Sequence, residues 1–425
     1  MISYKQSRYK LKRSKILIKD EIIKSANCLN RVSASDIFSK ANNPTADNAA
    51  FDGFVINSKD TKNLTKKKNK LFKILGTIAA GDKPFNKKLK KFQTVEIMTG
   101  GIIPKGFDTV IPIEQIVFHP NKKKPLHILI NKKVKKFQHL RLRGSDFKRN
   151  DLIIKKGTIL QSNHILALKT LGITNIKVKK IPKILFFSTG NEITNQEKIP
   201  NWKVRNSNSH YIQSLKGNFL FNFTNGGILK DKDESNFERK IKKMLKSNID
   251  IIITSGAISA GKFDYVPRVI KKFKLTNYFK NVAIRPGKPF LFAKIKGKQK
   301  AIFGLPGNPI SSAACFRFFV YPYLNNLLGI EDEKPIKAIL KNKFIKKINF
   351  TRFVKSKLNT TKNGNVEVEI LKGQESYKIQ SFIKSNIWTL LPSVNPNLKK
   401  MKLWIVFYPI IQINFLVKTS NFCCS

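Results

Sequence analysis

The N-terminal segment, residues 1–43, mixes basic residues with apolar residues at roughly helical spacing. Apolar side chains recur from Ile16 and Leu17 through Ile22 and Ile23. A repeat of three to four residues places apolar side chains on one side of an α-helix, where they can pack against a core. The pattern predicts one or two amphipathic helices here.

Residues 47–140 show a different pattern, in which short apolar runs are separated by Gly and Pro. Runs such as KILGTIAAG at 73–81 and TVEIMTG at 94–100 have the composition and punctuation of strands. The pattern predicts an inserted β domain. The flanking stretches, 1–46 and 141–180, then form one N-terminal helical or mixed domain that the insertion interrupts.

Strand-like and helix-like segments alternate over residues 181–329. Apolar runs such as IDIIITSG at 249–256 predict buried strands, and other stretches predict helices at Ser209–Lys216 and Asn236–Lys246. Strands joined through helices form right-handed crossovers, which give a parallel sheet with helices on both faces. The pattern therefore predicts a three-layer α/β domain.

Alternating apolar and polar residues return after residue 330, as in NVEVEIL at 365–371. Period-two alternation predicts strands, so residues 330–415 are expected to form a C-terminal β domain and residues 416–425 a tail. The fold class predicted for the whole chain is multidomain α/β and β. It consists of a three-layer α/β domain with an inserted β domain, a helical N-terminal segment and a C-terminal β domain.

The composition is that of a folded chain with several cores. Its 425 residues are 41% hydrophobic, which supplies enough apolar material for more than one domain. The sequence contains no run of about 18 uncharged apolar residues, and no apolar segment follows the basic N-terminus as in a signal peptide. The four cysteines have neither metal-ligand spacing nor the pattern of a disulfide framework. A cytoplasmic protein without membrane contact is expected.

The formal net charge of +56 suggests nucleic-acid binding, because clustered Lys and Arg neutralise phosphates. The lysines, however, are spread through nearly every segment together with many Ile, Asn and Phe residues. This distribution is typical of compositional bias, so no dedicated nucleic-acid partner is expected. A basic nucleic-acid-binding protein stays as the alternative of another class, and it would require aromatic residues interleaved on a basic sheet face.

The turn from Ser255 to Asp264 follows a predicted buried strand and contains two glycines, Gly256 and Gly261. At the carboxyl end of a parallel strand, small residues let a ligand approach the backbone and leave N–H groups free for an anion. These glycines and the two serines, Ser255 and Ser259, are therefore candidates for binding a phosphorylated ligand. An ordinary strand-to-helix turn is the alternative.

The same turn contains the G-x-x-x-x-G-K pattern that opens a P-loop. Phe263 stands where a P-loop has the Ser or Thr that binds Mg²⁺. An ATPase or GTPase is therefore disfavoured.

Two further turns have features suited to anions. In NVAIRPGKPFLFA, Arg285 and Lys288 flank a Pro-Gly turn beside an apolar strand. In FGLPGNPISSAACF, a turn with two prolines precedes a helix, so backbone amides and a capping hydroxyl can meet a phosphate. Capping of the helix alone is the alternative for the serines. The candidates from this second turn are Pro306, Gly307, Asn308 and Ser311.

Carboxylates stand at several turns in a chain that has only 26 acidic residues. Carboxylate oxygens suit Mg²⁺ coordination or proton transfer, so each is a candidate for one of these roles. Glu192 follows a predicted strand of the α/β domain, on the edge of the sheet that also carries Ser255. The other candidates are Asp52, Asp146 and Asp231.

Nine segments, taken in order, resemble the molybdopterin molybdenumtransferases, the family of bacterial MoeA and of the E domain of gephyrin. The resemblance runs from about Asn48 to Pro309 and is thinner on both sides. One such segment would be weak evidence of a relationship, but nine segments in the family's order are very unlikely to arise by chance. The segments are NAAFDGFVI, EIMTGGIIP, VIPIEQ, RGSDF, FSTGNEI, NSNS, SGAISAGKFDY, RPGKPF and GLPGNP.

The resemblance implies the last step of molybdenum cofactor biosynthesis. In that step adenylated molybdopterin is hydrolysed in the presence of molybdate, AMP leaves, and molybdenum enters the dithiolene. The resemblance also implies Mg²⁺ as cofactor and a homodimer in which the β insertion of one subunit faces the α/β domain of its partner. Molybdopterin adenylyltransferase is a candidate partner.

Position by position, the resemblance assigns the reacting side chains to two walls of one site. Asp52 and Thr99 would come from the β insertion, and Asp146 from the segment that returns to the helical domain. Glu192 and Asp264 would hold Mg²⁺ or orient water in the α/β domain. The ligands would meet the remaining candidates: Ser255, Gly256, Ser259, Gly261, Asp231, Arg285, Lys288, Pro306, Gly307, Asn308 and Ser311.

Two positions depart from the family pattern. Ala257 stands where the family has a second Gly, and its Cβ is expected to be tolerated if φ is negative there. Arg285 stands where the family has Lys, so the charge is kept with a different geometry. Among enzymes, molybdopterin adenylyltransferase is the alternative, because it shares the α/β module, but it would not need the β insertion. A receptor-clustering scaffold like gephyrin would need a second fused module, which nothing in this sequence resembles.

Overall fold

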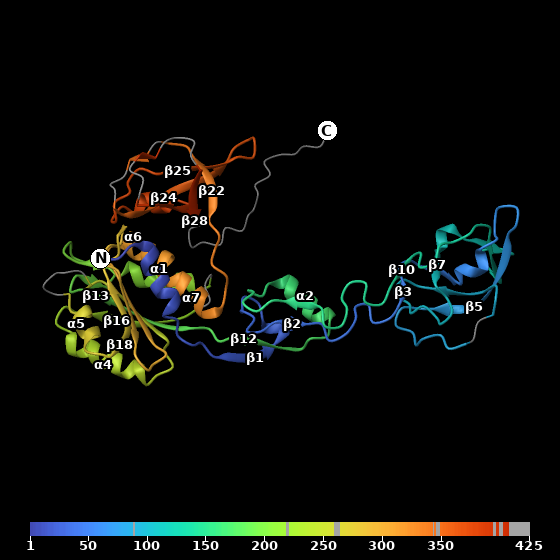
Figure 1. The fold of residues 1–425 in the computed structure, drawn as a ribbon, viewed down its shortest axis with the longest axis horizontal. Coiled ribbons are helices and arrows are strands. Elements are labelled where there is room, and N and C mark those ends of the chain that lie inside the picture. Colours follow the sequence, from blue (N-terminus) through green and yellow to red (C-terminus); the bar gives the residue numbers. More distant parts are fainter. Residues whose placement is uncertain are drawn as a thin grey trace.

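The computed structural model describes residues 1–87, 90–217, 221–258, 264–342, 344–345, 349–393, 397–398 and 403–407. The molecule is elongated, with a large α/β part at one end and an inserted β sheet at the other (Figure 1). A small middle part joins the two, and a C-terminal β part lies beside the α/β part. Within the described ranges, no helix is long and apolar enough to span a membrane.

A six-stranded mixed sheet forms the centre of the α/β part, in the order β16-β13-β17-β21-β20-β18. The first four strands are parallel, but β20 runs antiparallel to both of its neighbours, β21 and β18. The prediction of a parallel sheet is wrong at this edge, because only residues 296–300 connect β20 to β21, too few for a crossover helix. The strands are β13 (Lys183–Thr189), β16 (Asn222–Leu229), β17 (Ile251–Ser255), β18 (Leu275–Lys280), β20 (Leu291–Ile295) and β21 (Ala301–Leu305).

Helices cover both faces of this sheet and complete three layers. On one face α4 and α5 pack in a hydrophobic core, and on the other α1, α3, α6 and α7 pack in a larger one. The helices predicted at 209–216 and 236–246 are present, with ends displaced by at most two residues. The helices are α1 (Tyr4–Arg13), α3 (Ser207–Ser214), α4 (Glu234–Leu245), α5 (Val266–Lys271), α6 (Pro309–Cys315), a π-helix (Phe316–Val320) and α7 (Tyr321–Leu328).

The N-terminal segment differs from its prediction in two ways. Leu11 of α1, and Ile16 and Ile18 after it, are buried in the core of the α/β part, so this stretch does not belong to the middle part. Of the one or two helices predicted, α1 is present, but Ile22 and Ile23 lie in a strand, β1 (Asp20–Lys24), which pairs antiparallel with β12 (Asn175–Lys179). The partner strand satisfies the backbone groups of β1, and this tertiary pairing overrides the helical spacing of its apolar residues.

The middle part and the insertion are connected by two chain segments that lie side by side. In these segments β3 (Asn48–Ala49) pairs with β10 (Leu140–Arg141). The middle part contains β2 (Ile37–Phe38), β11 (Leu152–Ile154) and α2 (Ser162–Thr170). The inserted six-stranded sheet contains β7 (Thr109–Pro112), β4 (Gly53–Ile56), β6 (Gln93–Ile97), β5 (Lys70–Ile78), β9 (His127–Ile130) and β8 (Val117–His119), in this order.

The C-terminal part is a small closed barrel. Strand β24 pairs with both β25 and β26, and β22 and β28 complete the ring. The barrel is joined to the α/β part because β19 (Ile284–Arg285) pairs with the start of β24. Its elements are β22 (Ile336–Leu340), β24 (Thr351–Thr360), β25 (Val366–Ile370), α8 (Ile379–Lys384), β26 (Ile387–Leu391) and β28 (Leu403–Phe407). The remaining strand pairs are β14 (Ile193–Thr194) with β15 (Val204–Arg205), and β23 (Phe344–Ile345) with β27 (Asn397–Leu398).

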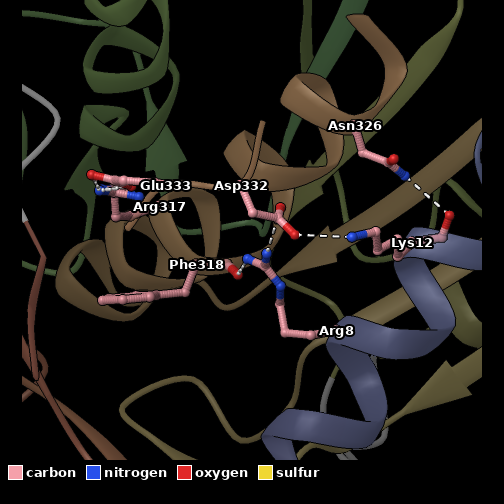
Figure 2. A network of polar contacts seen from close by, with 7 residues as sticks. All are labelled: Arg8, Lys12, Arg317, Phe318, Asn326, Asp332 and Glu333. Atoms are coloured by element: carbon pink, nitrogen blue, oxygen red, sulfur yellow. Dashed lines mark hydrogen bonds and ion pairs between the residues drawn. The ribbon is translucent and has the colours of Figure 1, made fainter. Parts of the chain in front are cut away.

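Polar contacts hold the linker before the barrel against α1 and the π-helix (Figure 2). The guanidinium of Arg317, which is 3% exposed, donates to both carboxylate oxygens of Glu333 at 2.7 and 2.5 Å. Arg8 and Lys12 of α1 pair with Asp332 at 3.6 and 3.1 Å. The N-terminal helix therefore helps to fix the point at which the chain leaves the α/β part for the barrel.

Candidate active site

Three parallel strands of the central sheet end at one edge. Strands β13, β17 and β21 are in register there, with Ser188 opposite Ser255 and Ser255 opposite Leu305. The loops after these strands, with the first residues of α3 and α6, surround a cavity of about 510 Å³. The beginning of a helix carries unpaired N–H groups and a partial positive charge, so this cavity suits an anion.

A hydrogen-bond network joins the walls of this first cavity. The side-chain amide of Asn208, on α3, donates to Ser255 Oγ at 2.6 Å and to the carbonyl of Gly307 at 2.7 Å. Ser255 Oγ donates to the carbonyl of Pro306 at 3.2 Å. The predicted residues Ser255, Pro306 and Gly307 therefore lie together, and Asn208, which belongs to the NSNS segment, links them.

Gly256 follows β17 and lies close to the end of the neighbouring strand β13. Its φ is +103°, and a Cβ on it would lie 2.6 Å from both the carbonyl oxygen and the Oγ1 of Thr189. The position therefore requires glycine on two independent grounds. Ala257 also has a positive φ, of +51°, so the sequence-based condition of a negative φ is not met. Left-handed backbone at a residue with a Cβ costs on the order of 1 kcal/mol.

Three carboxylate residues line the first cavity: Glu192, Asp231 and Asp264. The carboxylate of Glu192 lies over Gly190, where a Cβ would collide with it. Within the part of the chain that the structure describes, no three His, Cys, Asp or Glu residues are gathered closely enough to hold a metal by themselves. An ion in this cavity would therefore need further oxygen ligands from a substrate.

Arg285, Lys288 and Ser311 line a second cavity, of about 1030 Å³, between the α/β part and the barrel. The sequence placed these residues with Ser255 in one site, whereas the structure places them in the adjoining cavity. Pro289 borders both cavities. The predicted residues Ser259 and Gly261 lie outside the described residues, as does the predicted tail.

The second cavity carries an excess of positive charge. Arg285, Lys288, Arg352 and Lys372 line it, and within the described residues none of them forms an ion pair with a carboxylate. Burial, and then repulsion from Arg285, lowers the pKa of Arg352. The Nε of Arg352 is buried without a hydrogen-bond partner. Uncompensated guanidinium groups of this kind are typical of a site for an oxyanion.

The two cavities meet at one inter-domain contact. Asn308, which lines the first cavity, donates from Nδ2 to Ser376 Oγ, which lines the second, at 3.1 Å. The backbone N–H of Ile310 donates to the carbonyl of Ser376 at 3.3 Å. Sequence reasoning missed Arg352, which stands inside a strand without any turn signal, and it missed Ser376, although Gly373 after the predicted strand NVEVEIL is a signal that could have found it.

The candidates outside the α/β part do not join either cavity of their own chain. The inserted sheet, whose strand β4 follows Asp52, lies at the far end of the molecule (Figure 1). Thr99 donates from its backbone N–H and its hydroxyl to Asp52 Oδ1 at 2.6 and 2.7 Å, and these hydrogen bonds lower the pKa of Asp52. Asp146 accepts from Asn43 Nδ2 at 2.8 Å, in the paired segments that lead to the insertion.

The fold and the paired cavities define a multidomain α/β protein with a cavity suited to an anion at the carboxyl ends of its parallel strands. The family described as "MoeA N-terminal region (domain I and II)" matches residues 2–172, and "Probable molybdopterin binding domain" matches residues 186–326. The chain belongs to the molybdopterin molybdenumtransferase family, and it is a transferase.

Relatives and solved structures support this membership over most of the chain. The molybdopterin molybdenumtransferase of Staphylococcus epidermidis is 31% identical over 366 residues, 85% of each chain. That of Staphylococcus aureus strain COL is 33% identical over 340 residues, 79% of this chain and 78% of its own. The MoeA structure from Pyrococcus horikoshii OT3 has a TM-score of 0.80 at 26% identity and covers 96% of this chain and 100% of its own. The family and fold class predicted from the sequence are confirmed.

Proposed function

We propose that this protein inserts molybdenum from molybdate into adenylated molybdopterin and releases AMP, the last step of molybdenum cofactor biosynthesis. One observation carries the proposal: a strand-end cavity suited to a phosphorylated ligand adjoins a cationic cavity suited to an oxyanion, and the contact of Asn308 with Ser376 joins their walls. The relatives named molybdopterin molybdenumtransferase support the same reaction.

The pterin nucleotide binds in the first cavity. Gly256 and Gly307 line this cavity, and neither has a side chain that could fill it. The first residues of α3 and α6 direct N–H groups at its phosphates. The volume of about 510 Å³ is within the usual range for a small-molecule site.

Molybdate binds in the second cavity. A dianion neutralises the mutual repulsion of Arg285 and Arg352. Lys288 adds a mobile point charge beside Pro289, the residue that borders both cavities. Molybdate is thereby held next to the pterin nucleotide before the phosphoanhydride is cleaved.

Cleavage of the phosphoanhydride by water yields AMP and leaves the pterin phosphate, so the site must position water and neutralise phosphate charge. Glu192 and Asp264 orient that water, and their carboxylates could bind Mg²⁺ only together with oxygen ligands from the substrate phosphates, because no three such residues of the described chain are gathered closely enough. When bound, Mg²⁺ would neutralise charge on the phosphates. Glu192 and Asp264 are the residues that would hold it.

The active enzyme is a cytoplasmic homodimer in which Asp52 and Thr99 of one subunit complete the site of the other. The distance of the inserted sheet from the α/β part of its own chain supports a contribution in trans (Figure 1). Exposed apolar side chains on the segments around the middle part, such as Leu17, Ile22 and Leu166, supply surface that a second copy can cover. Molybdopterin adenylyltransferase is the proposed partner that delivers the substrate.

The deciding experiment mixes the purified protein with adenylated molybdopterin, Mg²⁺ and sodium molybdate, and follows AMP by chromatography. AMP release that requires molybdate is the expected result. Absence of AMP, or release at the same rate without molybdate, contradicts the proposal. A protein that instead consumes ATP and adenylates molybdopterin would be the adenylyltransferase, the alternative within the same cofactor pathway.

A further inference from the structure

Lys355 is a buried cation, and no carboxylate of the described residues forms an ion pair with its ammonium group. It lies on β24 of the barrel, and the residue is 1% exposed. Its Nζ donates to three backbone carbonyls, those of Gly373 at 2.7 Å, Lys378 at 3.0 Å and Glu375 at 3.2 Å. An ammonium group has three N–H donors, so all of them are used inside one short loop.

The rest of Lys355 binds the same loop. Its backbone N–H donates to Gln374 Oε1 at 2.9 Å, and its carbonyl accepts from Gln374 Nε2 at 2.8 Å and from the N–H of Leu371 at 3.1 Å. Burying a charge is unfavourable, and an apolar side chain would fill the same space without that cost. The ammonium group therefore serves the shape of the loop rather than the packing of the barrel.

The other side of this loop, residues 371–378, forms one wall of the cationic cavity. Residues 371–377 line that cavity. Ser376, on the same loop, makes the two hydrogen bonds to Asn308 and Ile310 that join the barrel to the first cavity. The carbonyls held by Lys355 belong to Gly373 and Glu375 before Ser376 and to Lys378 after it, so Ser376 lies between the points at which the loop is fixed.

We propose that Lys355 is a positioning residue for oxyanion binding, because its ammonium group holds the loop 371–378 in the shape that closes the cationic cavity and docks Ser376 on the turn beside the pterin cavity. The inference rests on the proposed function of that cavity as the molybdate site. Lys355 acts through the loop and does not itself line the cavity.

Titration of Lys355 provides a readout that a purely structural lysine would not give. Burial lowers the pKa of Lys355 to about 8; the charge of Glu375 raises this pKa and that of Lys378 lowers it, both to a smaller extent. The adjacent strand β26 contributes only uncharged residues, whereas β25 carries Glu367 and Glu369. The neutral amine has two N–H groups for three carbonyls, so one carbonyl loses its donor. Oxyanion affinity is therefore expected to fall severalfold between about pH 7 and pH 9.

The test measures sodium molybdate binding and AMP binding by calorimetry on the full-length protein, Lys355→Met and Lys357→Met. Lys357 is on the same strand but is exposed, so it is the matched control. Lys355→Met is expected to weaken molybdate binding about tenfold and to abolish the change across pH 8, while AMP binding and the Lys357→Met protein stay as in the parent. Equal molybdate affinity in both variants, or a pH dependence that persists in Lys355→Met, overturns the proposal.

Two controls keep the outcome interpretable. If Lys355→Met does not fold, the pH dependence of molybdate binding by the unsubstituted protein decides. Because an α-amino group also titrates at about pH 8, the same profile is measured on a protein with a short N-terminal extension, which moves the α-amino group of Met1 away from Val282, the bridge partner of Ile2. A flat profile, or a step that disappears with the extension, overturns the proposal. If the unsubstituted protein binds no molybdate, the proposed function of the cavity fails, and this result differs from a failure confined to Lys355.

Discussion

Replacing Gly256 by Ala is the sharpest test of the first cavity. The added Cβ would lie 2.6 Å from the carbonyl oxygen and from the Oγ1 of Thr189, well inside normal contact distance. The backbone there has φ of +103°, where a Cβ is strained in addition. Backbone strain of about 1–2 kcal/mol and overpacking of about 1–3 kcal/mol together predict a loss of about 2–5 kcal/mol in the free energy of unfolding.

The strand end is expected to avoid part of this cost by moving away from Thr189. Ser255 precedes Gly256 directly, so its hydrogen bonds to Asn208 and Pro306 would be displaced. A loss of even 1.4 kcal/mol of binding free energy lowers affinity about tenfold. Gly256→Ala should therefore lower the denaturation midpoint and weaken AMP binding at least about tenfold by calorimetry.

Gly307 provides the matched control on the facing turn of the same cavity. A Cβ there would meet only the Cα of Gly256, at 3.8 Å, which is ordinary van der Waals contact. Gly307→Ala is therefore expected to keep the denaturation midpoint close to that of the parent protein. If Gly256→Ala keeps the midpoint and the AMP affinity of the parent protein, the close approach at Gly256 does not shape the cavity and the reasoning is refuted.

Three further predictions concern other parts of the molecule. Arg317→Ala leaves the Glu333 carboxylate without its buried partner and should lower the free energy of unfolding, measured by chemical denaturation, by about 3 kcal/mol. The double variant Arg317→Met with Glu333→Leu should lower it clearly less, and equal losses in the two proteins would contradict this. Co-expressed Asp52→Ala and Glu192→Ala subunits, each inactive alone, should regain about a quarter of parental AMP release if sites are shared between subunits, and no recovery would exclude sharing. The free energy of unfolding of Ala257→Gly should stay within about 1 kcal/mol of the parent value, whereas that of Ala257→Val should be at least 1 kcal/mol lower still, because a β-branched residue fits poorly at φ of +51°. Equal free energies of unfolding for the Gly and Val variants would count against strain at this position.

The fold was predictable where local pattern and tertiary pairing agree. Helix α4 has an apolar stripe facing one hydrophobic core, and both the stripe and its ends can be read from the sequence. Strand β1 has apolar residues at helical spacing but pairs with β12, which is about 150 residues further along the chain. The antiparallel edge formed by β20 was missed because a five-residue connection is not recognisable among strand and helix patterns alone.

The site residues can likewise be divided into those that local sequence features indicate and those that only the packing of distant segments brings together. Ser255, Glu192 and Gly307 stand at strand ends and turns, features that a sequence displays, and the structure gathers them around one cavity. Their roles, and those of Asp52, Thr99 and Asp146, stay predictions. The cationic cavity could not be assembled in this way, because its wall combines the turn at Arg285 with the start of β24 and with the loop after β25.

The position of the turn that carries Arg285 and Lys288 explains why the one predicted site is divided into two cavities. Arg285 ends β19 and Lys288 lies three residues after it, and β19 pairs with β24 of the barrel and not with the central sheet, so this turn faces the barrel rather than the strand ends. A sequence shows that a cation stands at a turn, but not which domain covers it. Because the barrel covers this turn, the cations are separated from the carboxylates of the first cavity, and an oxyanion can be held close to a phosphorylated ligand without competing for the same groups.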